Sequence, residues 1–432
     1  MRLSARPLPE IGLTSRLVLH RLSVHEEDDD LIVGRVRRGN FVSLPEEVRP
    51  LLVALQEGAT VGEAENKARE RTGLEIDGIE FARGLVENGF VQEVDGVSLD
   101  PTDPGETEPP RPGISRVLFS APAVLLLLLW VGLATFETLL HPSIWPTYSS
   151  IFWSPYLSLS LGVVVGLASI EASVHEVAHR AAARSLGVPS RIRFGARLTN
   201  LILQTETPGL WSVPRRKRVR VYLAGMAWDA LVVASVLMLL VSIALPDWVQ
   251  RLLEGFLLMV LLSFTFQMQV YMRTDLYRVL AEVVRSPNLF TDAVEHLRWV
   301  GGRFLFRAHL RRTAPAGADP AAALPLRERK VVLAYAWGAA GVSIAATGAG
   351  LVIWGPVLVL LLYRAAVEVG AGLVTHSWVL VADGLGVLLL MTYDHVVWLH
   401  VKLRDRRETL REERSTAPPS ATDPAETAPA TP

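Results

Sequence analysis

The chain has 432 residues, of which half are hydrophobic and none is cysteine. This composition favours a membrane protein over a soluble one, and the lack of cysteine excludes disulfides, thiolate metal ligands and a cysteine nucleophile. The formal net charge of −1 gives no reason to expect a nucleic-acid partner.

We expect the first 30 residues to form an N-terminal arm. They are polar and charged, and they contain no apolar segment of the kind found in a signal peptide. We therefore expect the N-terminal part of the chain to stay in the cytoplasm.

Residues 31–99 are expected to form a small α+β domain with a winged-helix-like pattern. The β-rich runs 31–36 and 40–44 predict a hairpin, and three helical stretches follow. A capping box begins the second helix at Thr60, and Asn88-Gly89 ends the third. A DNA-binding module is the alternative, but residues 31–97 carry 8 Lys and Arg against 12 Asp and Glu. The difference, 8 − 12 = −4, has the wrong sign for binding phosphates.

The Pro-rich segment 100–113 predicts an extended linker to a membrane domain over residues 114–405. That domain contains apolar runs long enough to cross a membrane, which predicts an α-helical polytopic membrane protein with about six transmembrane helices. The runs are 117–140, 157–188, 219–245, 252–270, 331–354 and 377–401.

Arginine-rich segments flank these runs on one side, which places both termini in the cytoplasm of a multi-pass plasma-membrane protein. Residues 356–373 are apolar but contain Arg364 and Glu368, so we expect an interfacial or re-entrant segment there. Residues 406–432 are expected to form a charged and then disordered tail.

The motif His175-Glu176-Val177-Ala178-His179 lies inside the second apolar run. Two histidines four residues apart share one face of a helix, so both can bind one metal ion. Zinc held by two His and a carboxylate keeps one position open for water, and a nearby Glu can take the proton of that water. A solvated helix face is the alternative, but ionisable groups at membrane depth are costly unless paired or metal-bound. The motif therefore predicts a membrane zinc metalloprotease.

A site with two histidines needs a further protein ligand. Asp275 follows the fourth apolar run on the same side of the membrane and is the best-placed candidate. Asp229 in the third run is the second candidate, as a ligand or as a group that contacts substrate. Glu171 shares a helix face with the first histidine and is a hydrogen-bond partner for an imidazole or, less favourably, a ligand. The alternative for Asp275 is an interfacial acid paired with Arg273 or Arg278.

Two short β-compatible runs, 191–198 and 201–205, surround Thr199-Asn200 and predict a hairpin beside the zinc site. A protease must hold its substrate extended, and an exposed strand edge supplies backbone hydrogen bonds for that purpose. We therefore include Asn200 among the residues expected to contact substrate or support the site. A plain connecting loop is the alternative.

The HEVAH motif in one span and an Asp near the end of a later one resemble the site-2 protease class of intramembrane zinc metalloproteases, over about residues 157–280. The resemblance implies a zinc ion bound by His175, His179 and Asp275, with Glu176 as general base, and cleavage of peptide bonds within or beside the membrane.

The chain departs from that family at three places. Ala178 and Leu276 stand where members usually have glycine. Gly225-Met226 and Asp229 correspond loosely to the Gly-Pro and Asn of the family's intervening span. The presumed ligands and base remain intact, so a working protease is expected rather than an inactive relative.

Residues 31–99 resemble the PqqD-type peptide-recognition domain, through the segments 42–45, 58–61 and 89–91. In that family the domain captures the leader of a precursor peptide by adding it as a strand to a sheet edge. The two resemblances together imply a zinc leader peptidase that matures a ribosomally synthesised peptide, with the precursor and membrane lipid as partners. Cleavage of a membrane signalling protein and a non-catalytic membrane peptide-binding protein are the alternatives.

Overall fold

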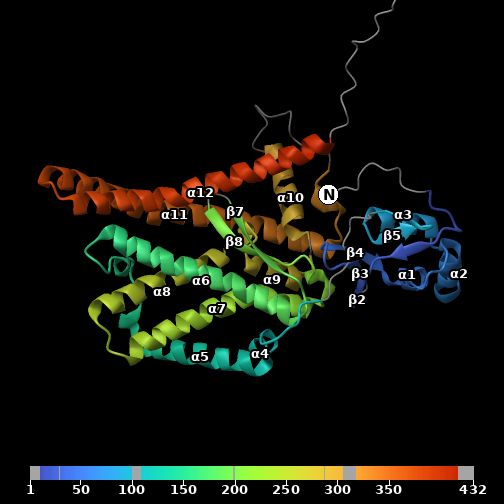
Figure 1. Cartoon of the computed structure of the whole chain (residues 1–432), viewed down its shortest axis with the longest axis horizontal. Helices are drawn as coiled ribbons and strands as arrows, with labels where there is room; N and C mark the ends of the chain where they lie inside the picture. Colours follow the sequence, from blue (N-terminus) through green and yellow to red (C-terminus); the bar gives the residue numbers. More distant parts are fainter. Residues whose placement is uncertain are drawn as a thin grey trace, which may run out of the picture.

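The structure is a computed structural model that describes residues 10–28, 30–99, 109–197, 200–286, 288–304 and 318–416. The described chain is mostly helical, with a small sheet region near the N-terminus. Figure 1 shows long helices running side by side and the N-terminal domain at one end of them.

The N-terminal domain packs three helices against two antiparallel sheets of order β2–β3–β4 and β1–β5–β6. Its apolar side chains share one core, in which Leu31, Val33, Leu51 and Phe90 are fully buried. Its strands are β1 (Leu17–Leu19), β2 (Ser23–Glu27), β3 (Asp30–Arg35), β4 (Asn40–Pro45), β5 (Val91–Val94) and β6 (Val97–Ser98), and its helices are α1 (Arg49–Gln56), α2 (Val61–Thr72) and α3 (Gly78–Glu87).

Local signals in this domain are confirmed. The expected hairpin is the β3–β4 pair. Thr60 caps α2, because its hydroxyl accepts from the backbone N–H of Glu63 and the Glu63 carboxylate accepts from that of Thr60. Helix α3 ends before Gly89, whose φ of +69° is the left-handed conformation that favours glycine.

The boundary expected at residue 31 is wrong. Strand β1 pairs with β5 and β2 pairs with β3, so residues before 31 complete both sheets. Ile11 and Leu17 are buried in the domain core. The described part of the N-terminal arm therefore belongs to the folded domain, because its strands satisfy backbone groups and its apolar side chains fill the core.

The membrane domain is a bundle of long helices with shorter ones at the end that faces the N-terminal domain (Figure 1). The helices are α4 (Ser115–Leu118), α5 (Ala121–Leu140), α6 (Leu157–Ser185), α7 (Arg215–Ser242), α8 (Asp247–Gln267), α9 (Asp275–Val284), α10 (Leu289–Phe304), α11 (Leu326–Thr375) and α12 (Trp378–Thr416). Helices α11 and α12 form a hairpin that holds the start of α6, because the Asp383 carboxylate accepts from the backbone N–H groups of Leu157 and Ser158 at 2.8 and 2.9 Å.

Seven stretches of the described chain are long and apolar enough to cross a membrane, one more than expected. Two of them, Leu326–Gly348 and Leu358–Thr375, lie in the same helix. The expectation of a separate interfacial or re-entrant segment over 356–373 is wrong, because α11 continues without a break through these residues. A helix of 50 residues is about 75 Å long, well beyond the roughly 30 Å of a bilayer's hydrocarbon core.

The segments that flank the membrane domain are only partly included in the described residues. Most of the expected linker, residues 100–108, and the last residues of the expected disordered tail, 417–432, lie outside the described residues. The charged segment after residue 405 is helical as far as Thr416, because α12 extends into it.

The hairpin expected between the second and third membrane helices is confirmed as β7 (Arg191–Arg197) and β8 (Asn200–Glu206). The hydroxyl of Thr205 in β8 donates to the backbone carbonyl of Glu176 in α6 at 2.9 Å. Strand β8 is therefore attached directly to the helix turn that carries the HEVAH motif.

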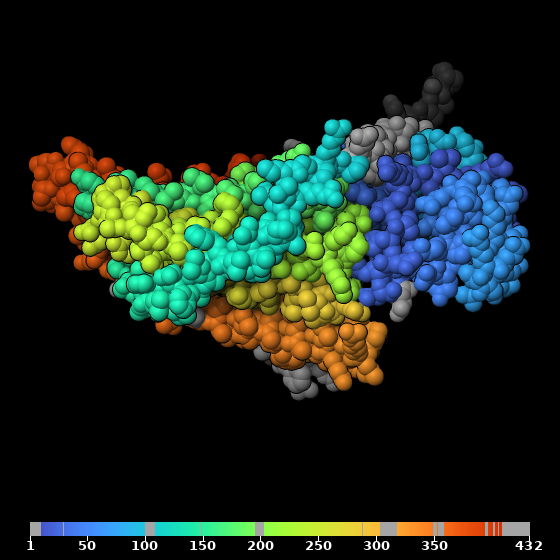
Figure 2. Space-filling view, turned by 90° about the horizontal axis from the view of Figure 1, so that it is seen from below, coloured from blue at the N-terminus to red at the C-terminus, as the bar shows by residue number. Residues whose placement is uncertain are grey.

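The N-terminal domain sits against the segment that follows this hairpin. A Cβ on Gly39, in the β3–β4 turn, would collide with Pro208, and a Cβ on Gly209 would collide with Val36. Figure 2 shows the domain as one end of an elongated molecule. The close approach of these glycines brings the β2–β3–β4 sheet next to the membrane helices.

Candidate metal centre

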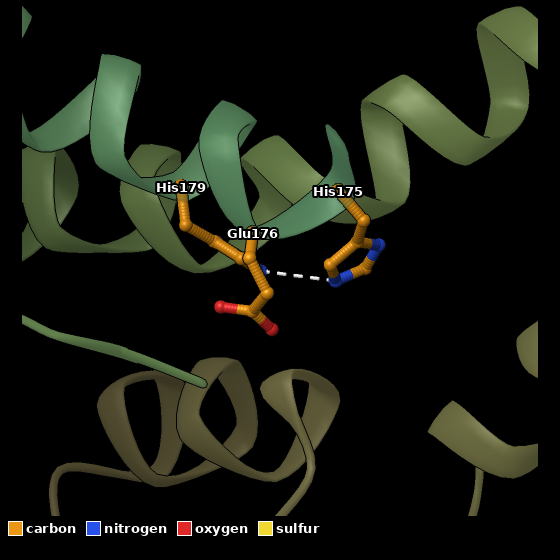
Figure 3. A group of neighbouring side chains, drawn as sticks. All are labelled: His175, Glu176 and His179. Atoms are coloured by element: carbon orange, nitrogen blue, oxygen red, sulfur yellow. Dashed lines mark hydrogen bonds between the residues drawn. The ribbon is translucent and has the colours of Figure 1, made fainter. Parts of the chain in front are cut away.

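Helix α6 places the imidazoles of His175 and His179 on one face, as the four-residue spacing predicts. Both side chains are buried, and their Nε2 atoms lie 3.1 Å apart (Figure 3). One ligand atom from each histidine and one from Glu176 all lie within 4.8 Å of one another.

Asp275 completes a triangle with the two histidines. Its Oδ2 lies 3.3 Å from Nε2 of His175 and 3.0 Å from Nε2 of His179. In a tetrahedral zinc site with bonds of about 2.0–2.1 Å, ligand atoms lie about 3.3 Å apart. Two nitrogens and one carboxylate oxygen thus have the spacing of three zinc ligands.

The outer nitrogens of both imidazoles are engaged, which fixes the direction of the inner ones. Nδ1 of His179 lies 2.7 Å from the backbone carbonyl of Val221, which can only accept, so this nitrogen carries the proton. Nδ1 of His175 lies 2.7 Å from Oδ1 of Asp229, a carboxylate that accepts in the same way. Neutral imidazoles in these tautomers aim both Nε2 lone pairs at Oδ2 of Asp275. Three acceptors that face one another repel unless a cation lies between them, so the residues present fit a metal ion.

Asp275 is held by the join between two helices. It is the first residue of α9, where free backbone N–H groups favour a negative charge. The side-chain oxygen of Gln267, at the end of α8, accepts from the Asp275 backbone N–H at 3.2 Å. The backbone carbonyl of Gln267 accepts from the Thr274 hydroxyl at 2.8 Å.

Glu176 projects beside the imidazoles and makes no hydrogen bond with the residues drawn in Figure 3. It lines a cavity of about 220 Å³ together with both histidines and Asp275. Residues Leu203 to Thr205 of β8 form another wall of the same cavity. A carboxylate in this position would lie beside a water molecule bound in the cavity to a metal ion held by the three converging atoms.

The other candidates do not complete the triangle. Asp229 is fully buried on the far side of His175 and contacts its Nδ1, so it supports that imidazole instead of facing Oδ2 of Asp275. Glu171 is buried beside Asp229 and lines the same cavity as the two histidines. Asn200 begins β8 at the turn of the hairpin, five residues and roughly 17 Å along the strand from Thr205. The structure thus does not bring Asn200 to the cluster.

Two contributors were not identified from the sequence as part of the site. Gly225 in α7 lies against the imidazoles, and a Cβ there would collide with Nε2 of both His175 and His179. The signal was a glycine inside an apolar helix, which often marks close backbone packing. Gln267 gave no comparable signal, because its contact with Asp275 spans a break between two helices.

Comparison of the chain with protein-family models, with curated proteins and with solved structures gives no match.

Proposed function

We propose that this chain is a membrane-embedded zinc metalloprotease of the site-2 protease kind. The observation that carries the proposal is the convergence of Nε2 of His175, Nε2 of His179 and Oδ2 of Asp275, each within 3.3 Å of the other two. Two imidazoles and one carboxylate form the ligand set of zinc peptidases, which leaves a fourth position open.

Zinc held by these three residues would polarise a peptide carbonyl and lower the pKa of a bound water molecule. Glu176 would take the proton of the attacking water and pass it to the leaving amine. Asp229 would keep the His175 imidazole in the tautomer that offers Nε2, as the Val221 carbonyl does for His179. Strand β8 lines the cavity and pairs with β7 on one side, so its other edge can hold a substrate extended.

The substrate would be a precursor peptide whose leader is removed. The N-terminal domain, which we propose to be of the PqqD type, would capture the leader by strand addition. Its contact with the segment after β8 supports this, because a captured leader would lie near the zinc site. Binding and cleavage within one molecule raise the effective concentration of substrate.

The membrane topology would consist of six crossings with both termini in the cytoplasm. Helix α11 is continuous, so its two apolar stretches serve a single crossing that begins beside α9 and α10 and ends near the start of α6. Helix α12 then returns. The arginine-rich segments around α9 and after α12 support a cytoplasmic location for the end that carries the N-terminal domain.

The test compares purified wild type with Glu176→Gln for zinc content and for cleavage of precursor peptides encoded beside the gene. Glu176→Gln should retain zinc and lose about 10²- to 10⁴-fold in cleavage rate, because the general base is gone and the ligands remain. Equal cleavage by both proteins would remove the proposed base. Zinc and peptide binding without cleavage by the wild type would favour a non-catalytic peptide-binding protein.

A further inference from the structure

A second cavity, of about 620 Å³, lies between the N-terminal domain and the membrane helices. One wall is the β2–β3–β4 sheet, including Phe41, Val42 and Ser43 of the edge strand β4. The opposite wall is formed by α7 and α9. The zinc proposal assigns no role to this space.

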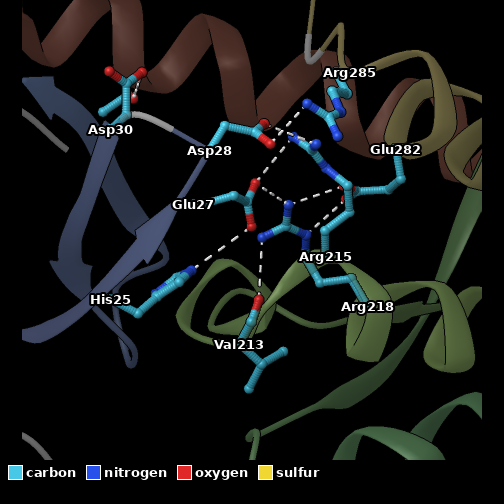
Figure 4. A network of polar contacts seen from close by, with 10 residues as sticks. His25, Glu27, Asp28, Asp30, Val213, Arg215, Arg218, Glu282 and Arg285 are labelled. Carbon is cyan, nitrogen blue, oxygen red and sulfur yellow. Dashed lines mark hydrogen bonds and ion pairs between the residues drawn. The ribbon is translucent and has the colours of Figure 1, made fainter.

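Charged side chains fix the two walls relative to each other (Figure 4). Arg218 of α7 is fully buried and donates to Glu282 of α9 at 2.7 Å and to Glu27 of β2 at 2.5 Å. Arg215 bridges the same two elements, with nitrogens 3.2 Å from Glu27 and 3.3 Å from Glu282, and it also contacts Asp28 just after β2 at 2.9 Å. Buried ion pairs require close contact to offset the cost of desolvation. Because these pairs join the two walls, they hold the walls at a fixed separation.

The two cavities meet at Tyr222 and Arg278, which line both of them. The Arg278 guanidinium lies 5.8 Å from the Tyr222 ring centroid. These residues form a neck between the sheet edge and the metal centre. A polypeptide that runs from the edge of β4 to the zinc site would pass this neck.

The charge of Arg278 is not neutralised locally. Within the described residues no carboxylate is in ion-pair contact with its guanidinium, although the side chain is half-buried. Glu282, four residues later on α9, is already bound by Arg218 and Arg215. Asp275, three residues earlier, faces the two imidazoles. A half-buried cation without a carboxylate is costly, and a substrate carboxylate would remove that cost.

We infer that Arg278 is a specificity-determining residue that binds an acidic side chain of the polypeptide substrate. This inference rests on the proposed peptide substrate but not on its hydrolysis. Arg278 is three residues after Asp275 on α9, a rise of about 4.5 Å along the helix. Because an extended chain advances about 3.3 Å per residue, the acidic residue should lie within about two residues of the scissile bond. This acidic residue should belong to the part of the substrate between the N-terminal domain and the scissile bond.

Selection from a random 20-residue peptide library tests this, with the library applied to detergent-solubilised Glu176→Gln protein so that no peptide is consumed. Peptides retained by this protein should be enriched several-fold in Asp or Glu at one position. Adding Arg278→Gln should abolish the enrichment, and adding Arg278→Glu should replace it with Lys or Arg. The matched control is Arg298→Glu, because Arg298 is an exposed arginine on α10 that lines neither cavity.

Each outcome decides the inference. Retained peptides without an acidic preference, no retained peptides, or a preference unchanged by Arg278→Glu would each overturn it, provided that zinc content and thermal unfolding match the control. The selected peptides are then incubated with wild-type protein. Acidic peptides that bind through Arg278 but are not cleaved would contradict the proposed protease and leave the role of Arg278 in place.

Discussion

Gly225 allows α7 to approach α6 at the point where the two imidazoles converge. A methyl group at this position would occupy the space of both Nε2 atoms, which are the atoms proposed to bind zinc. Neither imidazole can retreat without losing its Nδ1 contact, to Asp229 in one case and to the Val221 carbonyl in the other.

We therefore expect Gly225→Ala to lower zinc affinity by more than about tenfold, in the range found when the support of a metal ligand is lost. The measurement is zinc retention during titration with a chelator. Gly166→Ala is the control, because Gly166 lies in α6 and a Cβ there would meet open space. Unchanged zinc retention in Gly225→Ala would show that the imidazoles are not held as described.

The docking of β2 against α7 and α9 depends on ionised carboxylates. Burial raises the pKa of Glu27, but the hydrogen bond and charge of Arg218 outweigh burial and hold that pKa below the ordinary value of 4.5. An acid whose pKa is depressed in the folded state stabilises that state above its unfolded pKa, and the contribution is lost as pH falls through the lower folded value. Docking should therefore be intact at neutral pH and weaken below pH 4.5.

Spin labels measure this directly, since the chain has no cysteine of its own. Labels on Glu57→Cys in the N-terminal domain and Arg298→Cys in α10 should give a narrow distance distribution at pH 7 and a broad one below about pH 4. Glu27→Gln should give the broad distribution at both pH values. Glu87→Gln, which changes an exposed acid of the same domain, should behave as the parent does. A distribution in Glu27→Gln as narrow as the parent's at pH 7 would contradict the proposed docking.

The sequence predicted the elements that are determined by residues close together in the chain. The capping box at Thr60, the hairpin at residues 191–205 and the face shared by His175 and His179 depend on spacings of five residues or fewer, apart from the strand pairing itself. The sequence could not show that β1 belongs to the N-terminal domain, because its partner β5 is remote in the chain. Strand β2 pairs with the adjacent β3, but its polar sequence SVHEE contains no apolar run that would mark a strand.

The residues of the candidate site also fall into those that local spacing predicts and those that only the packing of helices reveals. The HEVAH spacing identified two candidate ligands and a base, and apolar runs placed Asp275 at a suitable depth. The choice between Asp275 and Asp229 needed the packing of three helices, which puts the first at Nε2 and the second at Nδ1 of His175. Arg278 gave no signal as a binding residue, because its unpaired charge is evident only when the partners of Glu282 are known.

The whole molecule presents its N-terminal domain and the end of α12 on one side of the proposed membrane. The opposite end contains the loop between α5 and α6 and the turn between α11 and α12 (Figure 1). Of residues 57, 143 and 406, six crossings would place residue 143 on the far side and the other two in the cytoplasm.

Single-cysteine labelling in intact cells checks this topology. Ser143→Cys should react with a membrane-impermeant maleimide, whereas Glu57→Cys and Arg406→Cys should react only after lysis, because all three positions are exposed on their own side. Labelling of Arg406→Cys in intact cells would indicate seven crossings and two separate spans within residues 326–375.

The most direct test of the zinc site is X-ray absorption at the zinc edge of the purified protein, beside Asp275→Ala. One zinc per chain should be present, with two imidazole nitrogens and additional oxygen ligands at about 2.0–2.1 Å, and Asp275→Ala should weaken retention and remove one oxygen ligand. A wild-type protein without zinc after metal-replete purification, or zinc bound without imidazoles, would contradict the metal centre and the protease proposed from it.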